Sequence, residues 1–223
     1  MATIYDCSDS AELLTGMRLA RQALGMGELI VLPTDTVYGV GCDAFNDAAV
    51  RRLLEAKGRG RNSPPPVLIP GIPTLDALAE NVPDEVRKLV KEFWPGALTV
   101  ILPARESLKW DLGETHGTVA LRMPDNDIAL ELLSETGPLA VSSANLTGKP
   151  VATTAREAYV ALGDTVTVYL DGGTVGNDNG SGSGNGNDSC STIVDATGLL
   201  LGRELTIVRH GAIPDDAILE VIR

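Results

Sequence analysis

The chain has 223 residues, 43% of them hydrophobic, which is enough for one large α/β domain or two small ones with a sizeable core. Its formal net charge of −12 argues against a broad electrostatic grip on nucleic acid, because such binding neutralises phosphates with many lysines and arginines. Two histidines and three cysteines without metal-ligand spacing leave little material for a metal site or a nucleophile–histidine pair.

The sequence also indicates where the protein works. No apolar stretch approaches the ~20 residues that span a bilayer, and the N-terminus lacks the basic-then-apolar order of a signal peptide. We therefore expect a cytoplasmic protein without membrane contact. In that compartment the odd number of cysteines is typical of reduced, structural thiols.

The first part of the chain is interpreted as helix, strand, loop and helix. Residues 9–12 resemble a capping box, and the helix that follows carries Leu13, Met17, Ala20 and Leu24 on one face before Gly25 ends it. The apolar run 28–32 has the length of a strand. A second helix begins after the cap at residues 46–47.

The rest of the chain continues this alternation. Strands are predicted at residues 67–69, 98–102, 118–122, 138–142, 166–170, 192–195 and 205–208, and helices at 83–94, 127–135 and 153–162. Alternating strands and helices predict a single α/β domain over residues 1–223. Several consecutive strands have no helix between them, so the sheet is expected to be mixed rather than purely parallel.

One segment, residues 172–188, departs from this order because it is almost entirely Gly, Asn, Ser and Asp. It has little apolar surface to offset the entropy of ordering it. Strands of the same sheet flank it. We predict a mobile insertion loop at about 172–189 rather than a domain linker, and an inert role is favoured over that of a lid.

Residues 32–39 (LPTDTVYG) form a turn rich in hydroxyls and glycine after the buried strand 28–32, where an open α/β sheet tends to bind a ligand. Lys57, Arg59 and Arg61 follow shortly afterwards. Such a cluster is usually a solvated surface run. The alternative is a phosphate clamp, in which arginine supplies forked donors and lysine a point charge, and the neighbouring turn favours it.

Arg122 ends a predicted strand whose other residues are largely apolar. An arginine in that place rarely lies buried without a partner, so either Asp125 or the carboxylate of a ligand must pair with it. Both alternatives stay open.

Residues 142–148 (SSANLTG) follow the strand 138–142 and would lie at its carboxyl end. They either build a turn or bind an amino acid or nucleotide. Neither a Gly-x-Gly-x-x-Gly nor a Walker-type loop is present, so phosphate binding would depend on side chains.

Together these segments resemble the YrdC-like family of threonylcarbamoyl-adenylate synthases. The matching motifs are PTDTVYGVG at 33–41, AKGR at 56–59, WPGALTVIL at 94–102, VALRMP at 119–124, SSANLTGKP at 142–150, STIVD at 191–195 and VRHG at 208–211. The resemblance implies a YrdC/RibB-like α/β fold: a single-domain, twisted, open mixed sheet with flanking helices and a large concave cavity.

The resemblance further implies that the protein makes threonylcarbamoyl-adenylate and pyrophosphate from L-threonine, bicarbonate and ATP, for t6A modification of tRNA. Threonine would be held by Thr36, Arg122, Ser143 and Ser191. ATP would be held by Lys57, Arg59, Ser63, Thr118, Asn145 and Arg209, with Lys57 and Arg59 as the catalytic cations. Mg²⁺ is implied with ATP, without protein ligands. The partners would be downstream proteins of the t6A transferase complex, with no stable direct tRNA binding.

The chain departs from the family at Leu68, where a histidine is common. An RNA-binding or ribosome-maturation module is the alternative function, although the acidic charge and few aromatic residues oppose it. A carbamoyl-transfer domain like that of hydrogenase-maturation factors is a third possibility, but the zinc-finger and acylphosphatase-like regions of those factors are missing from this sequence.

Overall fold

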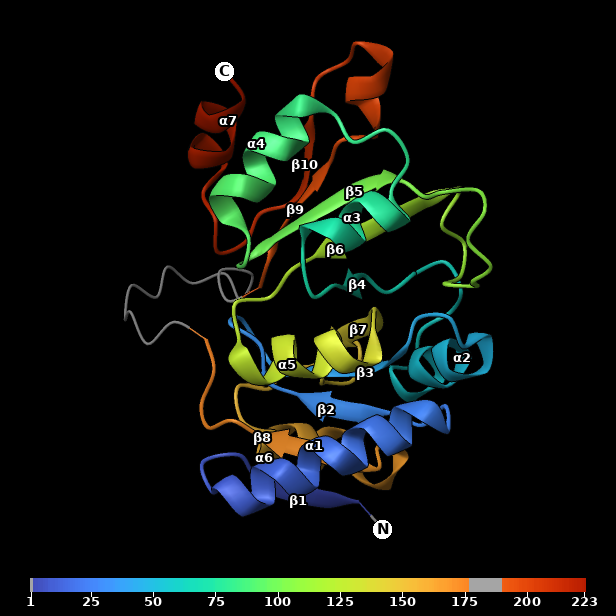
Figure 1. Cartoon of the computed structure of the whole chain (residues 1–223), viewed down its shortest axis with the longest axis vertical. Coiled ribbons are helices and arrows are strands. Elements are labelled where there is room, and N and C mark those ends of the chain that lie inside the picture. The colour runs from blue at the N-terminus through green and yellow to red at the C-terminus, as the bar shows by residue number, and fades with distance from the viewer. Residues whose placement is uncertain (1, 177–189) are drawn as a thin grey trace.

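The computed structural model describes residues 2–176 and 190–223, which form one mixed sheet with helices on both faces. Its strands are β1 (Thr3–Asp6), β2 (Ile30–Leu32), β3 (Gly39–Asp43), β4 (Val67–Leu68), β5 (Leu98–Pro103), β6 (Thr118–Arg122), β7 (Leu139–Ser143), β8 (Val168–Asp171), β9 (Thr192–Asp195) and β10 (Thr206–Arg209). They lie in the order β1-β8-β2-β3-β7-β4-β6-β5-β9-β10, from bottom to top in Figure 1. Parallel and antiparallel pairs both occur, as expected.

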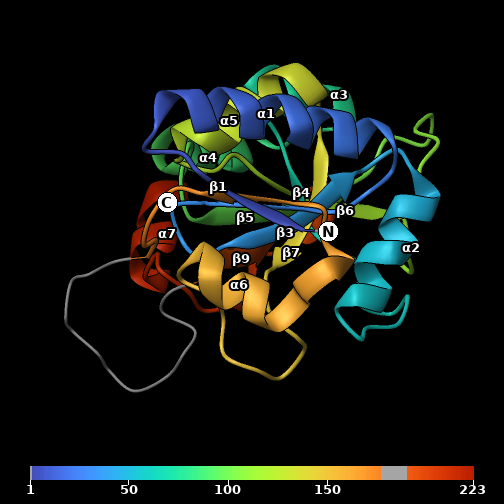
Figure 2. The same cartoon turned by 90° about the horizontal axis from the view of Figure 1, so that it is seen from below.

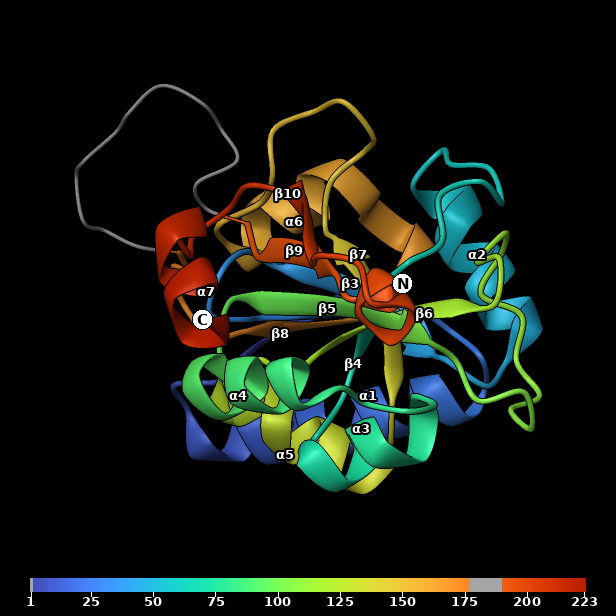
Figure 3. The ribbon, with the colours of Figure 1, turned by 90° about the horizontal axis from the view of Figure 1, so that it is seen from above.

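The helices cover the two faces of the sheet unequally. They are α1 (Ser10–Gly25), α2 (Asp47–Ala56), α3 (Ile72–Leu78), α4 (Asp84–Phe93), α5 (Asp127–Thr136), α6 (Ala155–Leu162) and α7 (Asp215–Ile222), with 3-10 turns at Gly163–Thr165 and Thr197–Leu201. Figures 2 and 3 show α1, α3, α4 and α5 on one face, and α2 and α6 on the other. The second face is therefore the less covered of the two. In the part of the chain that the structure describes, no helix has both the length and the apolar character that crossing a membrane requires.

Local caps explain why several helices start where the sequence predicts. The Asp9 carboxylate accepts hydrogen bonds from the amides of Ala11 and Glu12 at the start of α1. Thr154 and Glu157 form a reciprocal capping box at the start of α6. The expected helices and strands are confirmed to within a few residues, and the three cysteines are free thiols as expected.

Four elements escaped the sequence analysis: β1, β3, α3 and α7. The interpretation of the whole connection between the strand 28–32 and the cap at 46–47 as a loop is wrong from Gly39 on, because the chain turns back there and runs as β3 between β2 and β7, antiparallel to both. Residues 33–38 form the expected turn. A Cβ at Gly39 would lie 2.6 Å from the Cγ1 of Val141, so the glycine lets the Val141 side chain lie across β3. A strand that contains two glycines has no apolar alternation to reveal it.

The two-residue strand β4 creates a gap in the middle of the sheet. Pro64, Pro65 and Pro66 precede it, and a proline has no amide hydrogen for a strand ladder. Pairing of β4 with β6 and β7 is therefore confined to Val67 and Leu68. At the level of the prolines, no strand lies between β6 and β7, and this leaves space for a ligand.

The predicted loop at about 172–189 falls mostly outside the described residues. Its first residues are described: the hydroxyl of Tyr38 donates to the carbonyl of Gly173 at 2.6 Å, and the amide of Val175 donates to the carbonyl of Thr153 at 2.9 Å. These bonds attach the start of the segment to the connection after β2 and to the residues before α6.

Candidate active site

A cavity of about 230 Å³ opens at the gap beside β4. Seven strands and the connections before β3 and β4 contribute to its wall. We call it the cationic cavity, because three arginines and no carboxylate are among its lining residues: Thr34, Thr36, Val37, Gly39, Arg59, Pro64, Pro66, Leu68, Thr99, Arg122, Val141, Ser142, Ser143, Cys190, Ser191, Ile193 and Arg209.

Arg122 is a buried residue in the wall of this cavity and has a carboxylate partner within the protein. Its Nη2 donates to Asp35 at 2.6 Å and its Nη1 to the hydroxyl of Thr36 at 3.0 Å. Its Nε donates to the carbonyl of Gly96 at 3.0 Å. Of the two partners left open by the sequence, Asp125 is wrong: its amide donates to Asp35, and Asp35 is the carboxylate that pairs with Arg122. Burial lowers the pKa of Arg122, and the charge of Asp35 opposes that shift.

Arg59 and Arg209 have neutral partners instead. Arg59 donates to the hydroxyls of Thr147 and Ser142, at 3.0 and 3.3 Å. Arg209 donates twice to the carbonyl of Ser191 and once to its hydroxyl, at 2.7 to 2.9 Å. Within the described residues neither arginine is paired with a carboxylate. Burial, with the nearby positive charge of Arg59, lowers the pKa of Arg209.

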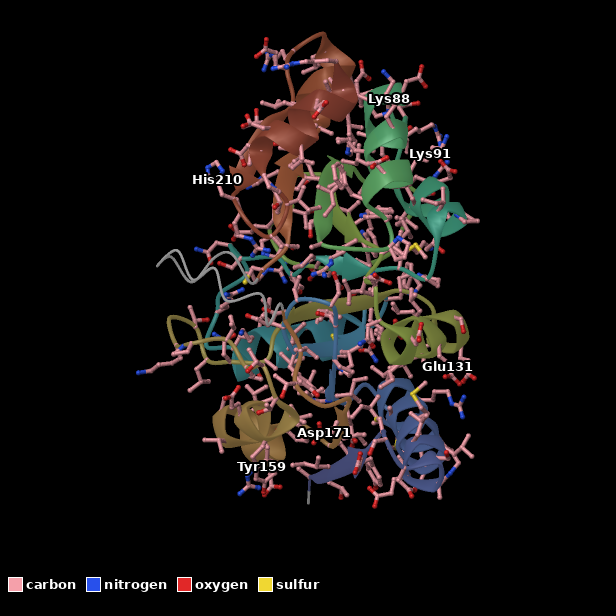
Figure 4. All side chains as sticks on the ribbon, turned by 90° about the vertical axis from the view of Figure 1, so that its left-hand side faces the viewer. Lys88, Lys91, Glu131, Tyr159, Asp171 and His210 are labelled. Atoms are coloured by element: carbon pink, nitrogen blue, oxygen red, sulfur yellow. The ribbon has the colours of Figure 1, made fainter. Side chains whose placement is uncertain are left out.

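The segment that carries Ser191 is held by a close backbone contact. A Cβ at Gly211 would lie 2.5 Å from the carbonyl oxygen of Cys190, so glycine lets the chain after β10 pass against the residues before β9. The Ser191 hydroxyl also lies 2.8 Å from that of Thr99 on β5. Figure 4 shows His210, next to Arg209, on the side of the sheet opposite the α4 residues Lys88 and Lys91.

Lys57 is fully buried behind the cationic cavity instead of lining it. Its ammonium donates to the carbonyls of Ser143 and Asn145, with the Asn145 Oδ1 at 2.9 Å and the Ser143 Oγ at 3.3 Å. The carbonyl of Lys57 accepts from the hydroxyl of Thr147 at 2.7 Å. These bonds attach the C-terminal end of α2 to the segment after β7. Burial, and to a smaller extent the charge of Arg59, lower the pKa of Lys57 to about 7.

The third cation of the cluster points elsewhere. Arg61 makes a two-pronged ion pair with Asp111, with both N···O distances 2.8 Å, and its side chain is exposed. Its carbonyl accepts from the amide of Glu114 at 2.7 Å. Arg61 therefore fastens the residues before β4 to the connection between β5 and β6, and it is not part of a phosphate clamp.

A second cavity, of about 170 Å³, adjoins the first and shares Pro64, Pro66 and Ile193 with it. We call it the apolar cavity, because its lining is mostly hydrophobic: Pro64, Pro65, Pro66, Ile101, Leu112, Thr115, Thr118, Val119, Ala120, Ile193 and Val208. The Thr118 hydroxyl lies in this wall and donates to the carbonyl of Thr115 at 2.8 Å.

The ten residues named from the sequence thus fall into four groups. The cationic cavity gathers six of them: Thr36, Arg59, Arg122, Ser143, Ser191 and Arg209. Thr118 lines the apolar cavity, and Lys57 and Asn145 bond to each other behind the first. Ser63 lines neither cavity and lies at the turn closed by its amide on the carbonyl of Gly60.

Sequence reasoning missed four polar residues that build the site: Thr34, Asp35, Thr99 and Ser142. Thr34 donates to the carbonyl of Val37 at 2.7 Å, which leaves its oxygen to accept from Thr36. Thr99 is the one hydroxyl in an otherwise apolar strand, and that interruption is a signal that could have identified it. Asp35 had a similar signal, as an acid between two threonines directly after an apolar strand.

Comparisons with known proteins agree with this architecture. The Sua5/yciO/yrdC family model, described as "Telomere recombination", matches residues 22–211. A Mycobacterium tuberculosis protein named "Putative threonylcarbamoyl-AMP synthase" is 45% identical over 222 residues, which is 100% of this chain and 96% of that protein. A Bacillus subtilis threonylcarbamoyl-AMP synthase is 42% identical over 159 residues, which is 70% of this chain and 46% of that protein.

Solved structures give the same answer. Pyrococcus abyssi Sua5 complexed with L-threonine superposes with a TM-score of 0.84 at 32% identity, covering all of this chain, which spans 61% of the Sua5 chain. Escherichia coli YciO, with a TM-score of 0.80 over 98% of this chain and all of its own, is 22% identical and shows the fold alone. With a family model that matches most of its length and a relative that aligns from end to end, this chain belongs to the Sua5/YciO/YrdC family.

Proposed function

We propose that this protein is a threonylcarbamoyl-AMP synthase, an enzyme of the nucleotidyltransferase class that forms L-threonylcarbamoyladenylate and pyrophosphate from L-threonine, bicarbonate or carbon dioxide, and ATP. The observation that carries the proposal is the unequal charge of the cationic cavity. Arg122 is compensated by Asp35, whereas Arg59 and Arg209, which line the same cavity, have only neutral partners. An amino acid and a nucleoside triphosphate need these two environments.

The surroundings of Arg122 suit the amino acid. A zwitterion brings one carboxylate, and a guanidinium binds a carboxylate through two parallel N–H···O bonds. Hydroxyls of Thr36, Ser143 and Ser191 line the same cavity and can bond to the threonine side chain. A site that bonds to a substrate hydroxyl discriminates strongly against analogues that lack it. Curated relatives carry the matching name, and one solved relative is a complex with L-threonine.

Arg59 and Arg209 suit the phosphates. Two guanidiniums without carboxylate partners repel each other, and a polyanion between them relieves that repulsion. The adjoining apolar cavity can take the adenine ring, with the Thr118 hydroxyl in its wall. Arg59, Arg209 and Thr118 would therefore contact ATP, as the resemblance implies. Lys57 and Asn145 would act on ATP through the segment that they hold beside Ser143.

The reaction needs positioning and charge stabilisation more than a proton-transfer group. The neutral amine of threonine attacks carbon dioxide and loses a proton to water to give a carbamate, whose oxygen then attacks the α-phosphorus while pyrophosphate leaves. Among the described residues that line the cationic cavity there is no histidine, lysine or carboxylate to act as a general base. Arg59 and Arg209 would stabilise the charge of the leaving pyrophosphate, and Arg122 would fix the amino acid for attack.

We propose that Mg²⁺ accompanies ATP. Within the described residues no group of three or more His, Cys, Asp or Glu side chains could hold a metal ion. The hydroxyls of Ser142 and Ser143 and the phosphate oxygens of ATP are oxygen donors of the kind that Mg²⁺ accepts, and this ion usually keeps several waters. When bound, it would neutralise part of the phosphate charge.

The product would be consumed in the t6A modification of tRNAs that read codons starting with A, by proteins of the t6A transferase complex. No stable direct binding of tRNA is proposed, because the net charge of −12 opposes a large phosphate-binding surface.

The test is an incubation of the pure protein with Mg²⁺, ATP, bicarbonate and each amino acid in turn, followed by mass detection of the carbamoyl-adenylate. We expect the adduct and pyrophosphate with threonine, and at least ten-fold less with serine or valine. Pyrophosphate release that is independent of threonine and bicarbonate would contradict the proposal.

A further inference from the structure

The donors of Arg122 are divided between the protein and the cationic cavity. A guanidinium has five N–H groups, and three of them are used by Gly96, Thr36 and Asp35. One N–H therefore remains on each terminal nitrogen. That is the number that a carboxylate takes in a two-pronged contact. The orientation of these two donors depends on the three groups that hold the others.

Asp35 is the one charged group among these three partners. Its side chain is 16% exposed and that of Arg122 is 8% exposed, so the pair is largely shielded from water. Asp35 also accepts the amide of Asp125 at 3.1 Å. It thereby connects the residues after β2 to those after β6, the strand that carries Arg122.

Asp35 does not line the cationic cavity, although its neighbours Thr34 and Thr36 do. Any effect on a ligand must therefore pass through Arg122. Without Asp35 the buried guanidinium would have only neutral acceptors. It would then be free to turn one terminal nitrogen away from the ligand, and an uncompensated buried charge favours such a movement.

We infer that Asp35 is a positioning residue for substrate recognition: it fixes Arg122 so that the two remaining N–H groups meet the carboxylate of an α-amino acid. This inference rests on the proposed function. It predicts that loss of Asp35 weakens the binding of threonine much more than the binding of ATP.

The experiment compares Asp35→Ala, Asp35→Asn and the control Asp125→Asn by steady-state pyrophosphate release and by calorimetric binding of threonine. Asp125→Asn removes one negative charge next to the pair but keeps the amide that Asp35 accepts. We expect Asp35→Ala to raise the KM for threonine 10- to 100-fold and the KM for ATP less than 3-fold. Asp35→Asn keeps an acceptor oxygen, so it should raise the KM for threonine only 3- to 10-fold. Asp125→Asn should match the wild type.

The calorimetric arm separates the two possible failures. If wild-type protein binds threonine and makes the adenylate but the KM for threonine is unchanged in Asp35→Ala, the positioning role is wrong and the proposed function stands. The positioning role is equally wrong if the KM values for threonine and ATP rise by equal factors. If wild-type protein binds no threonine, both proposals fall. Should Asp35→Ala not fold, an unchanged KM for threonine in Asp35→Asn overturns the inference.

Discussion

The arginines of the cationic cavity carry the same chemical group in two different electrostatic settings. Arg122 is buried and paired with Asp35, whereas Arg59 and Arg209 are half-buried and contact hydroxyls and a carbonyl. A guanidinium whose charge is compensated by the protein binds a singly charged group without accumulating further positive charge. Two uncompensated guanidiniums form a site that is complete only when an anion arrives. We propose that this difference separates the group that binds the amino acid from the groups that bind the phosphates.

The largest expected effect comes from removing the compensated arginine. Arg122→Ala deletes the group that meets the amino acid and leaves Asp35 without its partner in a largely dry environment. Breaking a buried pair in this way costs roughly 3–5 kcal/mol, or about 10²- to nearly 10⁴-fold in an equilibrium. We expect kcat/KM for threonine to fall by about that factor, and the free energy of unfolding to fall as well, measured by pyrophosphate release and urea denaturation.

The matched control for Arg122→Ala is Arg87→Ala, which breaks the exposed pair of Arg87 and Asp76 on the helical face. Such a surface pair contributes about 0–1 kcal/mol, so stability and activity should stay close to those of the wild type. Wild-type use of threonine by Arg122→Ala would show that the buried pair serves folding alone.

The role of the two arginines without carboxylate partners is tested by Arg59→Ala and Arg209→Ala. Each removes a charged donor, and hydrogen bonds to charged groups contribute about 1.5–3 kcal/mol, so the KM for ATP should rise roughly 10- to 100-fold. The KM for threonine should change much less. Arg61→Ala is the control two residues from Arg59, because Arg61 is exposed and paired with Asp111. Equal effects of Arg59→Ala and Arg61→Ala would contradict the division of the cluster.

These arginines also mark the limit of what the sequence could predict. Amphipathic helices and their caps depend on neighbours within a few residues, so α1 and α6 were predicted closely. The partners of Arg61 and Arg122 lie 50 and 87 residues away along the chain. Nothing local distinguishes Arg59 from Arg61, or Asp35 from Asp125. The residues of the site could be named from motifs, but which of them face the ligand is decided by tertiary contacts.

Lys57 provides a test of how the segment that carries Ser143 and Asn145 is attached to the end of α2. Burial lowers its pKa from 10.5 to about 7, so between these values the unfolded chain binds one more proton than the folded chain. The free energy of unfolding must then rise with pH across this window, by on the order of 1 kcal/mol per pH unit. Below about pH 7 both states are charged and this dependence disappears.

The measurement is the free energy of unfolding of wild type minus that of Lys57→Met, from urea denaturation between pH 6 and about pH 10. We expect the difference to be constant up to about pH 7 and then to increase, because methionine cannot titrate. A difference that stays flat throughout would mean that the carbonyls of Ser143 and Asn145 hold the proton on Lys57. In that case the buried lysine would be a permanent cation behind Arg59.

The smallest expected effect concerns the apolar cavity, which adjoins the cationic cavity. Thr118→Val keeps the shape of the side chain but removes the hydroxyl that donates to Thr115. The Thr118 oxygen would also accept from the amino group of adenine. Loss of one neutral hydrogen bond costs about 0.5–1.5 kcal/mol, so loss of this contact should raise the KM for ATP roughly 2- to 10-fold with the KM for threonine unchanged. Thr136→Val is the matched control, because its hydroxyl donates to the carbonyl of Leu132 at 2.9 Å on α5, which covers the opposite face. If the two variants lose the same stability but neither changes the KM for ATP, the adenine ring does not lie in the apolar cavity.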